Sequence, residues 1–236
     1  MKRNVAITLK GVSKKYILHH EKPTLVESLI KRKEVFWALK NINLEVRKGD
    51  KLGIIGPNGS GKSTLLKIIT SITIPTKGKV RTSGKIASLI DLEAGFEPDL
   101  TGEENIYING LLLGMTKKEI NKNFKKIIRF SGIKKFIDSP LYTYSSGMKL
   151  RLGFSVAVYS NPDILIVDEI ISVGDENFRN KSLRKIQKFF KAKKTIIFVS
   201  HNFDLLKKLC SHTIWLEHGR IKASGPSEIV IKKYIS

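Results

Sequence analysis

The sequence predicts an α/β fold organised around a parallel sheet, and three observations support this prediction. Residues 164–167 and 195–199 are continuous apolar runs of strand length, which is typical of parallel strands covered on both faces. A third strand is expected at residues 51–55, where an apolar segment leads into a glycine-rich loop and a helix. Between the first two strands, apolar residues recur at helical spacing: Leu183, Ile186, Phe189 and Phe190.

Two other parts of the chain have patterns of their own. Residues 5–9 and 42–46 alternate apolar and polar side chains, which predicts half-buried strands. Residues 102–135 are mainly helical, with one apolar stripe at Ile120, Phe124, Ile127 and Ile128. We therefore expect one domain over residues 1–236, with a helical lobe at about residues 100–160.

Residues 19–34 interrupt the two N-terminal strands and predict a short amphipathic helix. Thr24 and Glu27 fit a capping box, and the basic run 31–33 complements the C-terminal end of the helix dipole. Leu25, Val26, Leu29 and Ile30 form its apolar face. Such a helix suits a membrane interface or a partner protein. Packing against its own domain is the alternative, and the pattern alone favours neither.

The composition excludes several classes of protein. The single cysteine, Cys210, excludes a disulfide framework and a multi-thiolate metal site within one chain. No apolar run approaches the roughly 18–20 residues that span a bilayer. The N-terminus has no signal-peptide core. We expect a chain that works in a reducing cytoplasm and does not cross a membrane by itself.

The net charge of +22 is unevenly placed along the chain. Basic residues gather at residues 1–48, 117–135 and 179–194, and the remainder is close to neutral. Such stretches can mark nucleic acid, an anionic lipid surface or an anionic substrate. For the second and third stretches we favour solvated helix faces.

The glycine-rich loop between the strand at 51–55 and the following helix is a phosphate-binding loop. Its glycines allow consecutive backbone N–H groups to converge on phosphate oxygens, and the helix adds the positive end of its dipole. Lys62 is expected to reach the β- and γ-phosphates, and the Ser63 hydroxyl to ligate Mg²⁺. The sequence therefore predicts that the chain binds a nucleoside triphosphate through these residues: Gly56, Pro57, Asn58, Gly59, Ser60, Gly61, Lys62, Ser63 and Thr64.

Two adjacent acids, Asp168 and Glu169, follow the buried strand at 164–167. Carboxylates at the end of a buried strand indicate a cation or a reaction. We expect Asp168 to hold Mg²⁺, directly or through water, and Glu169 to polarise the attacking water as a general base.

A serine- and glycine-containing segment precedes another helix, at Ser145, Ser146 and Gly147. In the form Tyr-Ser-Ser-Gly-Met it resembles the signature motif of ATP-binding cassette (ABC) ATPases. Residues 172–175, which end at Asp175, are similar to the D-loop of that family. His201, which follows the strand at 195–199, is similar to its switch histidine. With the phosphate loop and the acid pair, five motifs stand in the family's order over nearly the whole chain.

The resemblance implies a phosphate-loop NTPase fold of ABC type. This fold has a mixed-sheet RecA-like core, an antiparallel N-terminal β subdomain and a helical subdomain. It also implies ATP and Mg²⁺ as cofactors. In this family each ATP lies between the phosphate loop of one subunit and the signature motif of another. The chain has one copy of each element, so the resemblance implies a homodimer with two composite sites.

The sequence departs from the family pattern in two places. In the family a glutamine after the third strand contacts Mg²⁺ and the transport partner, but the only glutamine here is Gln187. Asp91 or Glu93 substitutes for it, which makes Asp91 a candidate Mg²⁺ ligand, or the contact is lost. Tyr16 is similar to the aromatic residue that stacks on adenine, but the insert separates it from the next strand. Trp37 is the competing candidate.

The insert and the local motifs resemble a subgroup of the family, the ATPases of polysaccharide exporters. This resemblance implies two copies of a separate membrane permease as partners. It implies as cargo a lipid-linked anionic glycan, either a lipid-linked polysaccharide or a teichoic acid. It places the chain peripherally on the cytoplasmic face of the cell membrane. Some members carry a C-terminal sugar-recognition domain, for which too few residues follow His201 here; this member lacks it or the sequence has been cut. The alternatives are an ATPase of another ABC transporter class and a soluble nucleic-acid-associated ATPase. We expect no nucleic acid.

Overall fold

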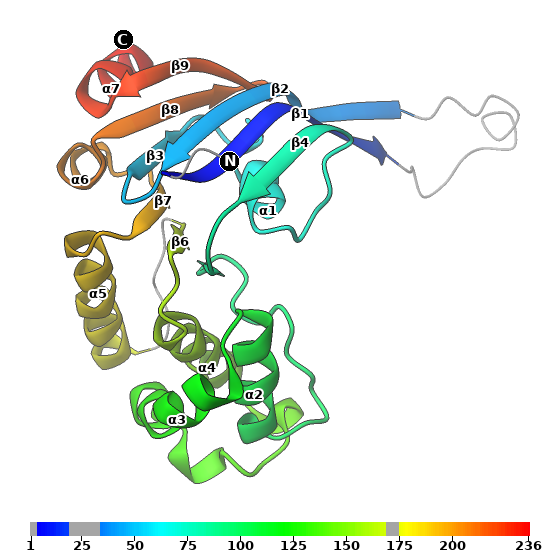
Figure 1. Cartoon of the computed structure of the whole chain (residues 1–236), viewed down its shortest axis with the longest axis vertical. Helices are drawn as coiled ribbons and strands as arrows, with labels where there is room; N and C mark the ends of the chain where they lie inside the picture. Colours follow the sequence, from blue (N-terminus) through cyan, green and yellow to red (C-terminus); the bar gives the residue numbers. More distant parts are fainter. Residues whose placement is uncertain (1–3, 19–33, 169–174) are drawn as a thin grey trace, which may run out of the picture.

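The structure, a computed structural model, describes residues 4–18, 34–168 and 175–236, and contains two sheets and a helical lobe (Figure 1). The larger sheet has the strand order β5-β6-β7-β3-β8-β9. Its strands are β3 (Lys51–Ile55), β5 (Ile86–Ser88), β6 (Ile164–Val167), β7 (Thr195–Val199), β8 (His212–Glu217) and β9 (Arg220–Pro226). All neighbouring pairs are parallel except β8 and β9, so the predicted mixed sheet is confirmed.

The two apolar runs in the centre of this sheet are buried on both faces, as predicted. Every residue of β6 and β7 is buried. Because side chains alternate along a strand, Leu165 and Val167 enter one core while Ile164 and Ile166 enter the other. Helix α1 (Lys62–Ile69) packs on one side, and on the other lie α4 (Ser146–Tyr159), α5 (Glu176–Lys191), α6 (Phe203–Leu209) and α7 (Ser227–Ile235).

The smaller sheet is antiparallel and has the order β2-β1-β4. Its strands are β1 (Val5–Leu18), β2 (Glu34–Arg47) and β4 (Lys77–Thr82). The first two are longer than the alternating segments predicted from the sequence. They form a ribbon that projects beyond the rest of the sheet (Figure 1). The helix predicted at residues 19–34 lies outside the described residues, apart from Glu34, which already belongs to β2.

The helical lobe contains α2 (Gly102–Leu112), α3 (Lys117–Ser131) and α4, together with the short helices η1 (Lys134–Phe136) and η2 (Leu141–Thr143). Thr101 and Thr116 begin α2 and α3 with complete capping boxes. The apolar stripe predicted on α3 faces the core of this lobe, where Ile120 and Ile127 are fully buried. The stripe predicted on α5 is wrong at Leu183, whose side chain is exposed.

No helix in the described parts of the chain is long and apolar enough to cross a membrane.

We predict that Phe154→Ala lowers the free energy of unfolding by about 3–5 kcal/mol, because it empties a closely packed core site. Phe154 is fully buried, stacks on Phe130 and contacts the edge of Phe178. Urea denaturation measures the loss. Phe136→Ala is the matched control, since that side chain is 49% exposed. Equal losses in the two variants would contradict this assignment of the core.

Candidate active site

The phosphate loop fits closely against its neighbours because two of its glycines have no side chain. A Cβ atom on Gly56 would lie 2.0 Å from the backbone oxygen of Leu216 in β8. A Cβ atom on Gly61 would lie 2.5 Å from the backbone oxygen of Ala38 in β2. Both glycines also have positive φ angles, 149° and 105°. The loop is therefore wedged between two strands that belong to different sheets.

The end of this loop has the features of an anion-binding site. Gly61 precedes α1 in a left-handed conformation, and no side chain caps the helix. The first N–H groups of α1 thus lack a side-chain partner and add to the positive end of the helix dipole. The Lys62 ammonium donates to the backbone oxygens of Gly56 (2.7 Å) and Pro57 (2.9 Å), which holds it over the loop. Within the described residues, the buried Ser60 hydroxyl has no hydrogen-bond partner.

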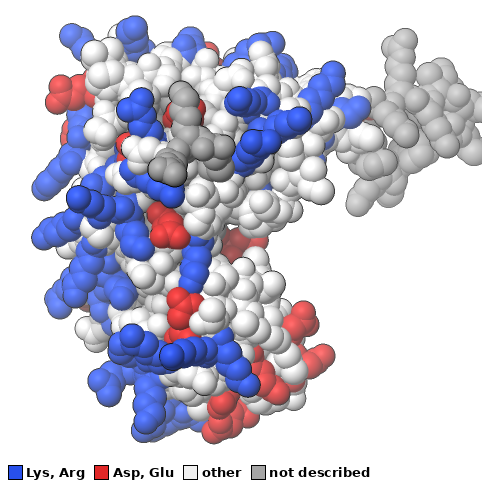
Figure 2. Space-filling view, in the orientation of Figure 1, with Lys and Arg blue, Asp and Glu red and all other residues white. Residues whose placement is uncertain are grey.

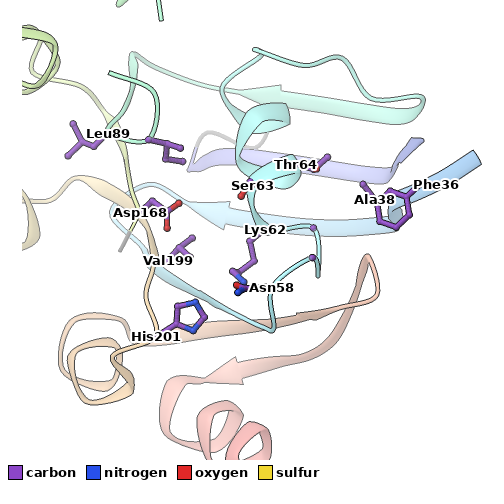
Figure 3. Close-up of a pocket in the computed structure, with 13 residues that line it drawn as sticks. Phe36, Ala38, Asn58, Lys62, Ser63, Thr64, Leu89, Asp168, Val199 and His201 are labelled. Atoms are coloured by element: carbon purple, nitrogen blue, oxygen red, sulfur yellow. The ribbon is translucent and has the colours of Figure 1, made fainter. Parts of the chain in front are cut away.

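A cavity of about 520 Å³ opens in front of the loop (Figure 3). Lys62, Ser63 and Thr64 reach it from α1, and Asn58, Gly59 and Gly61 from the loop. Asp168 follows β6 and His201 follows β7, and both line the same cavity. These two residues meet because β6 and β7 are adjacent parallel strands whose carboxyl ends share one edge of the sheet. The structure thus brings together the predicted phosphate loop, Asp168 and His201.

The chain's donor set fits a nucleotide with a hard divalent cation. Ser63 and Asp168 offer a hydroxyl and a carboxylate at one cavity, the oxygen ligands that Mg²⁺ takes alongside phosphate and water. Among the residues that the structure describes, no group of three or more His, Cys, Asp or Glu side chains could hold a metal by itself. Glu169 lies outside the described residues, so its role stays a prediction.

The structure separates the aromatic candidates for adenine stacking. Phe36 and Ala38 line the cavity, whereas Trp37 lines a different hollow on the other face of β2, with Ser13 and Arg220. The assignment of Trp37 to the nucleotide cavity therefore has no support in this geometry. Tyr16 pairs with Phe36 across the two strands, so both rings lie on one face of the ribbon. The strand period of two places residues 36 and 38 on a common face and could have identified Phe36.

Asp91 does not reach the cavity. After β5, the cavity is lined by Leu89 and Ile90, while Asp91 and Glu93 are exposed. The apolar neighbours turn toward the site because Leu89 is buried in the core beside β6. The sequence-based assignment of Asp91 as a metal ligand is thus without support in this structure.

The signature segment also lies outside the cavity. Ser145 begins α4, and its hydroxyl accepts a hydrogen bond from the Met148 N–H at 3.2 Å. Ser145 and Ser146 are exposed, and the space around a Cβ atom on Gly147 is open. The segment therefore presents a helix N-terminus to the surface of the helical lobe.

Asp175 has a structural role of its own at the start of α5. Its carboxylate accepts from the Phe178 N–H at 2.8 Å and pairs with Arg151 of α4 at 3.2 Å. The hydrogen bond from the Phe178 N–H, together with the nearby Arg151 guanidinium, lowers the pKa of Asp175. The carboxylate thus stays ionised and joins two helices of different parts of the fold, while the predicted D-loop before it lies outside the described residues.

The fold and the site define a phosphate-loop nucleotide-binding protein of the cassette type. The family model described as ABC transporter matches residues 39–172, more than half of the chain. The chain belongs to the ABC transporter family.

Two relatives and one solved structure extend this comparison. The chain is 51% identical over 193 residues to the O-antigen export system ATP-binding protein RfbB of Myxococcus xanthus, covering 81% of this chain and 44% of that protein. It is 42% identical over 234 residues to the teichoic acids export ATP-binding protein TagH of Bacillus cereus, covering 98% of this chain and 42% of that protein. The chain thus spans less than half the length of these two relatives. The fold matches the dimeric, post-hydrolysis structure of the ATP-binding cassette MJ0796 with a TM-score of 0.70 at 24% identity, covering 94% of this chain and 98% of that one.

We predict that Lys62→Ala abolishes measurable ATP binding, because it removes the only side-chain ammonium among the residues that line the described cavity. Titration of a fluorescent ATP analogue measures the affinity. Lys67→Ala, on the same helix and not among the residues that line the cavity, is the control for the loss of one charge. Unchanged affinity in Lys62→Ala would overturn the role assigned to this residue.

Proposed function

We propose that this chain is the ATP-hydrolysing subunit of an ABC exporter that moves a lipid-linked polysaccharide or teichoic acid across the cytoplasmic membrane. The observation that carries the proposal is the convergence of Lys62, Ser63, Asp168 and His201 on one cavity. The names of the two relatives support the kind of cargo proposed, since one is an ATP-binding protein of an O-antigen export system and the other of a teichoic acids export system.

The motif residues have distinct parts in the proposed reaction. The loop N–H groups and Lys62 bind and orient the phosphates. Ser63 and Asp168 would hold Mg²⁺, which when bound would supply positive charge to offset that of the phosphates. Glu169 accepts a proton from the attacking water, and His201 orients the γ-phosphate from the end of β7.

A second copy of the chain completes the site in this proposal. The cavity lacks a contribution from Ser145, Ser146 and Gly147, of which the two serines are exposed on the helical lobe. A homodimer with a two-fold axis would place the signature segment of one subunit over the phosphate loop of its partner, and would do so twice. The dimeric cassette MJ0796 has the same fold, which supports this arrangement.

The transmembrane path belongs to a separate permease, of which two copies would accompany the homodimer. This chain would lie peripherally on the cytoplasmic face of the membrane, where ATP is available. The export systems named for the two relatives support the presence of such a partner.

The proposal is tested by reconstitution. The chain and the candidate permease are incorporated into proteoliposomes, and ATP turnover is measured with and without the permease and its lipid-linked glycan. We expect the permease to change the turnover rate and the glycan to change it again. A turnover rate that is indifferent to the permease would contradict a role in export, while leaving the ATPase assignment intact.

We predict that Glu169→Gln retains ATP affinity but loses most turnover, since base catalysis typically contributes about 10²–10⁴-fold. The bound ATP then persists, and the protein accumulates as a closed dimer. Single-turnover hydrolysis and light scattering measure the two effects. Glu176→Gln, at the start of α5 outside the residues that line the cavity, is the charge control. Normal turnover in Glu169→Gln would show that another group is the base.

A further inference from the structure

A second hollow, far from the phosphate loop in the fold, lies where α3, the end of α4 and α5 meet. Its volume is about 440 Å³, comparable with that of ligand pockets in general. It shares no lining residue with the nucleotide cavity. Figure 2 shows that Lys and Arg side chains gather over this part of the molecule. The hollow is lined by Met115, Glu119, Lys122, Asn123, Lys126, Val158, Tyr159, Ser160, Asn161, Lys185 and Phe189.

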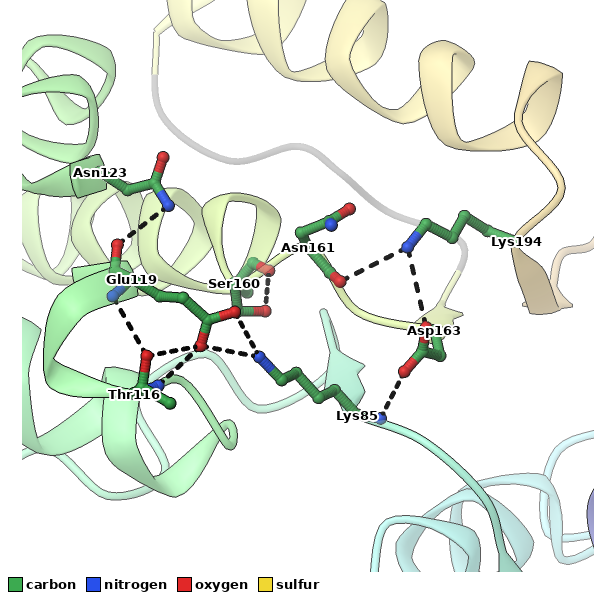
Figure 4. A network of polar contacts seen from close by, with 9 residues as sticks. Lys85, Thr116, Glu119, Asn123, Ser160, Asn161, Asp163 and Lys194 are labelled. Carbon is green, nitrogen blue, oxygen red and sulfur yellow. Dashed lines mark hydrogen bonds and ion pairs between the residues drawn. The ribbon is translucent and has the colours of Figure 1, made fainter.

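Three ammonium groups face this hollow, from Lys122 and Lys126 of α3 and Lys185 of α5. The only acidic residue in the lining is Glu119, and its charge is already matched. Lys85 donates to both of its carboxylate oxygens, at 2.8 and 3.0 Å (Figure 4). Hydrogen bonds from Lys85, and further ones from the backbone and side chain of Thr116, lower the pKa of Glu119 to about 2. The hollow is thus left with positive charge that its own acid does not balance.

The end of α4 supplies only part of a counter-charge. A helix C-terminus carries about half a negative charge. Some of this is met locally, because the Ser160 hydroxyl donates to Ala157 and the Lys194 ammonium to the backbone oxygen of Asn161 (Figure 4). The positive charge of the three ammonium groups is therefore larger than the partial negative charge at the end of α4. In the described part of the chain, none of the three forms an ion pair.

Lys185 is the lysine in which the effect of this unbalanced positive charge is seen most directly. Its Nζ lies 4.1 Å from the centroid of the Tyr159 ring, which fixes it against the wall of the hollow. Burial lowers the pKa of this ammonium, and the charges of Lys188 and Lys126 lower it further. A bound anion would relieve this repulsion. Met115, Val158 and Phe189 form a buried apolar wall beside the half-buried Lys185, while Lys122 and Lys126 are exposed to solvent.

We propose that this hollow binds a compact polyanion, a small molecule or headgroup that carries two or more phosphate groups. Three ammonium groups on two helices match several phosphate oxygens better than a single carboxylate. The source is either a free phosphorylated metabolite or the phosphorylated headgroup of a lipid. The site is independent of the nucleotide cavity and of the proposed function.

The test uses inorganic pyrophosphate as the probe, with the phosphate loop first saturated by ADP so that only a second site is titrated. Calorimetry gives the affinity, and ¹⁵N NMR locates the site through the side-chain amides of Asn123 and Asn161. The test variant is Lys122→Ala/Lys126→Ala/Lys185→Gln. The control, Lys118→Ala/Lys125→Ala/Lys191→Ala, removes the same charge from exposed positions of the same two helices.

We expect the test variant to bind pyrophosphate at least about a hundredfold more weakly, since each charge-assisted hydrogen bond is worth roughly tenfold or more in affinity. The control is expected to stay within a few-fold of the original protein. Equal weakening in both variants would mean that only net charge matters, and would overturn the site. Absence of pyrophosphate binding by the original protein at millimolar concentration, or of shifts at the two amides, would overturn it as well.

A second arm distinguishes the two sources. Vesicles of phosphatidylcholine with and without diacylglycerol pyrophosphate, whose headgroup carries two phosphates as the soluble probe does, are sedimented with the original protein and both variants. Loss of vesicle binding in the test variant alone identifies a lipid headgroup. Pyrophosphate binding that depends on the hollow, without such vesicle binding, identifies a free metabolite. Vesicle binding that falls equally in both variants, without a pyrophosphate site, leaves only a general basic surface and contradicts the proposal.

Discussion

The close approach of the phosphate loop to two strands is the constraint on which the rest of the site depends. Gly56 lies against a carbonyl of β8 and Gly61 against a carbonyl of β2, at separations that no side chain could occupy. This double contact ties the loop to both sheets at once, so it fixes the origin and direction of α1. The N-terminus of α1 and Lys62 then face the edge of the large sheet where Asp168 follows β6 and His201 follows β7. A small displacement of the loop would separate the cation-holding groups from the phosphate-holding groups.

In a single protomer the same geometry supplies only one side of the site, so the oligomeric state matters for whether the site is complete. The cavity has phosphate-binding groups on the side of α1 and strand-end groups beneath them, while the serine-rich start of α4 faces outward on a different lobe. We therefore propose that a second copy of the chain supplies the missing wall. Binding energy from nucleotide would then be coupled directly to closure of two subunits, the kind of differential interaction that a ligand-driven conformational change needs.

Much of this could be predicted from the sequence, because the motif residues are contiguous and their elements are strongly patterned. The phosphate loop needed only its glycines and flanking elements, and Asp168 was predicted from its place at the end of a buried strand. His201 was assigned only through its resemblance to the switch histidine of the family. The choice between Tyr16 and Trp37 could not be settled, since it depends on which face of β2 turns toward the loop; Phe36 lines the cavity instead. Asp91 is not among the residues that line the cavity, because the chain after β5 turns Leu89 and Ile90 toward it and leaves Asp91 exposed. The basic hollow could not be foreseen, because residues 117–135 and 179–194 are far apart in the sequence and come together only in the folded chain, beside the end of α4.

The most direct measurement of the central claim is complementation between two inactive variants. Lys62→Ala destroys the phosphate-loop half of a site, and Gly147→Asp destroys the signature half. If each site is shared between subunits, a mixed dimer contains one intact site, and an equal mixture should recover roughly a quarter of the original ATPase activity by random pairing. If each protomer carries a complete site by itself, the mixture stays as inactive as its components, and that result would contradict the account.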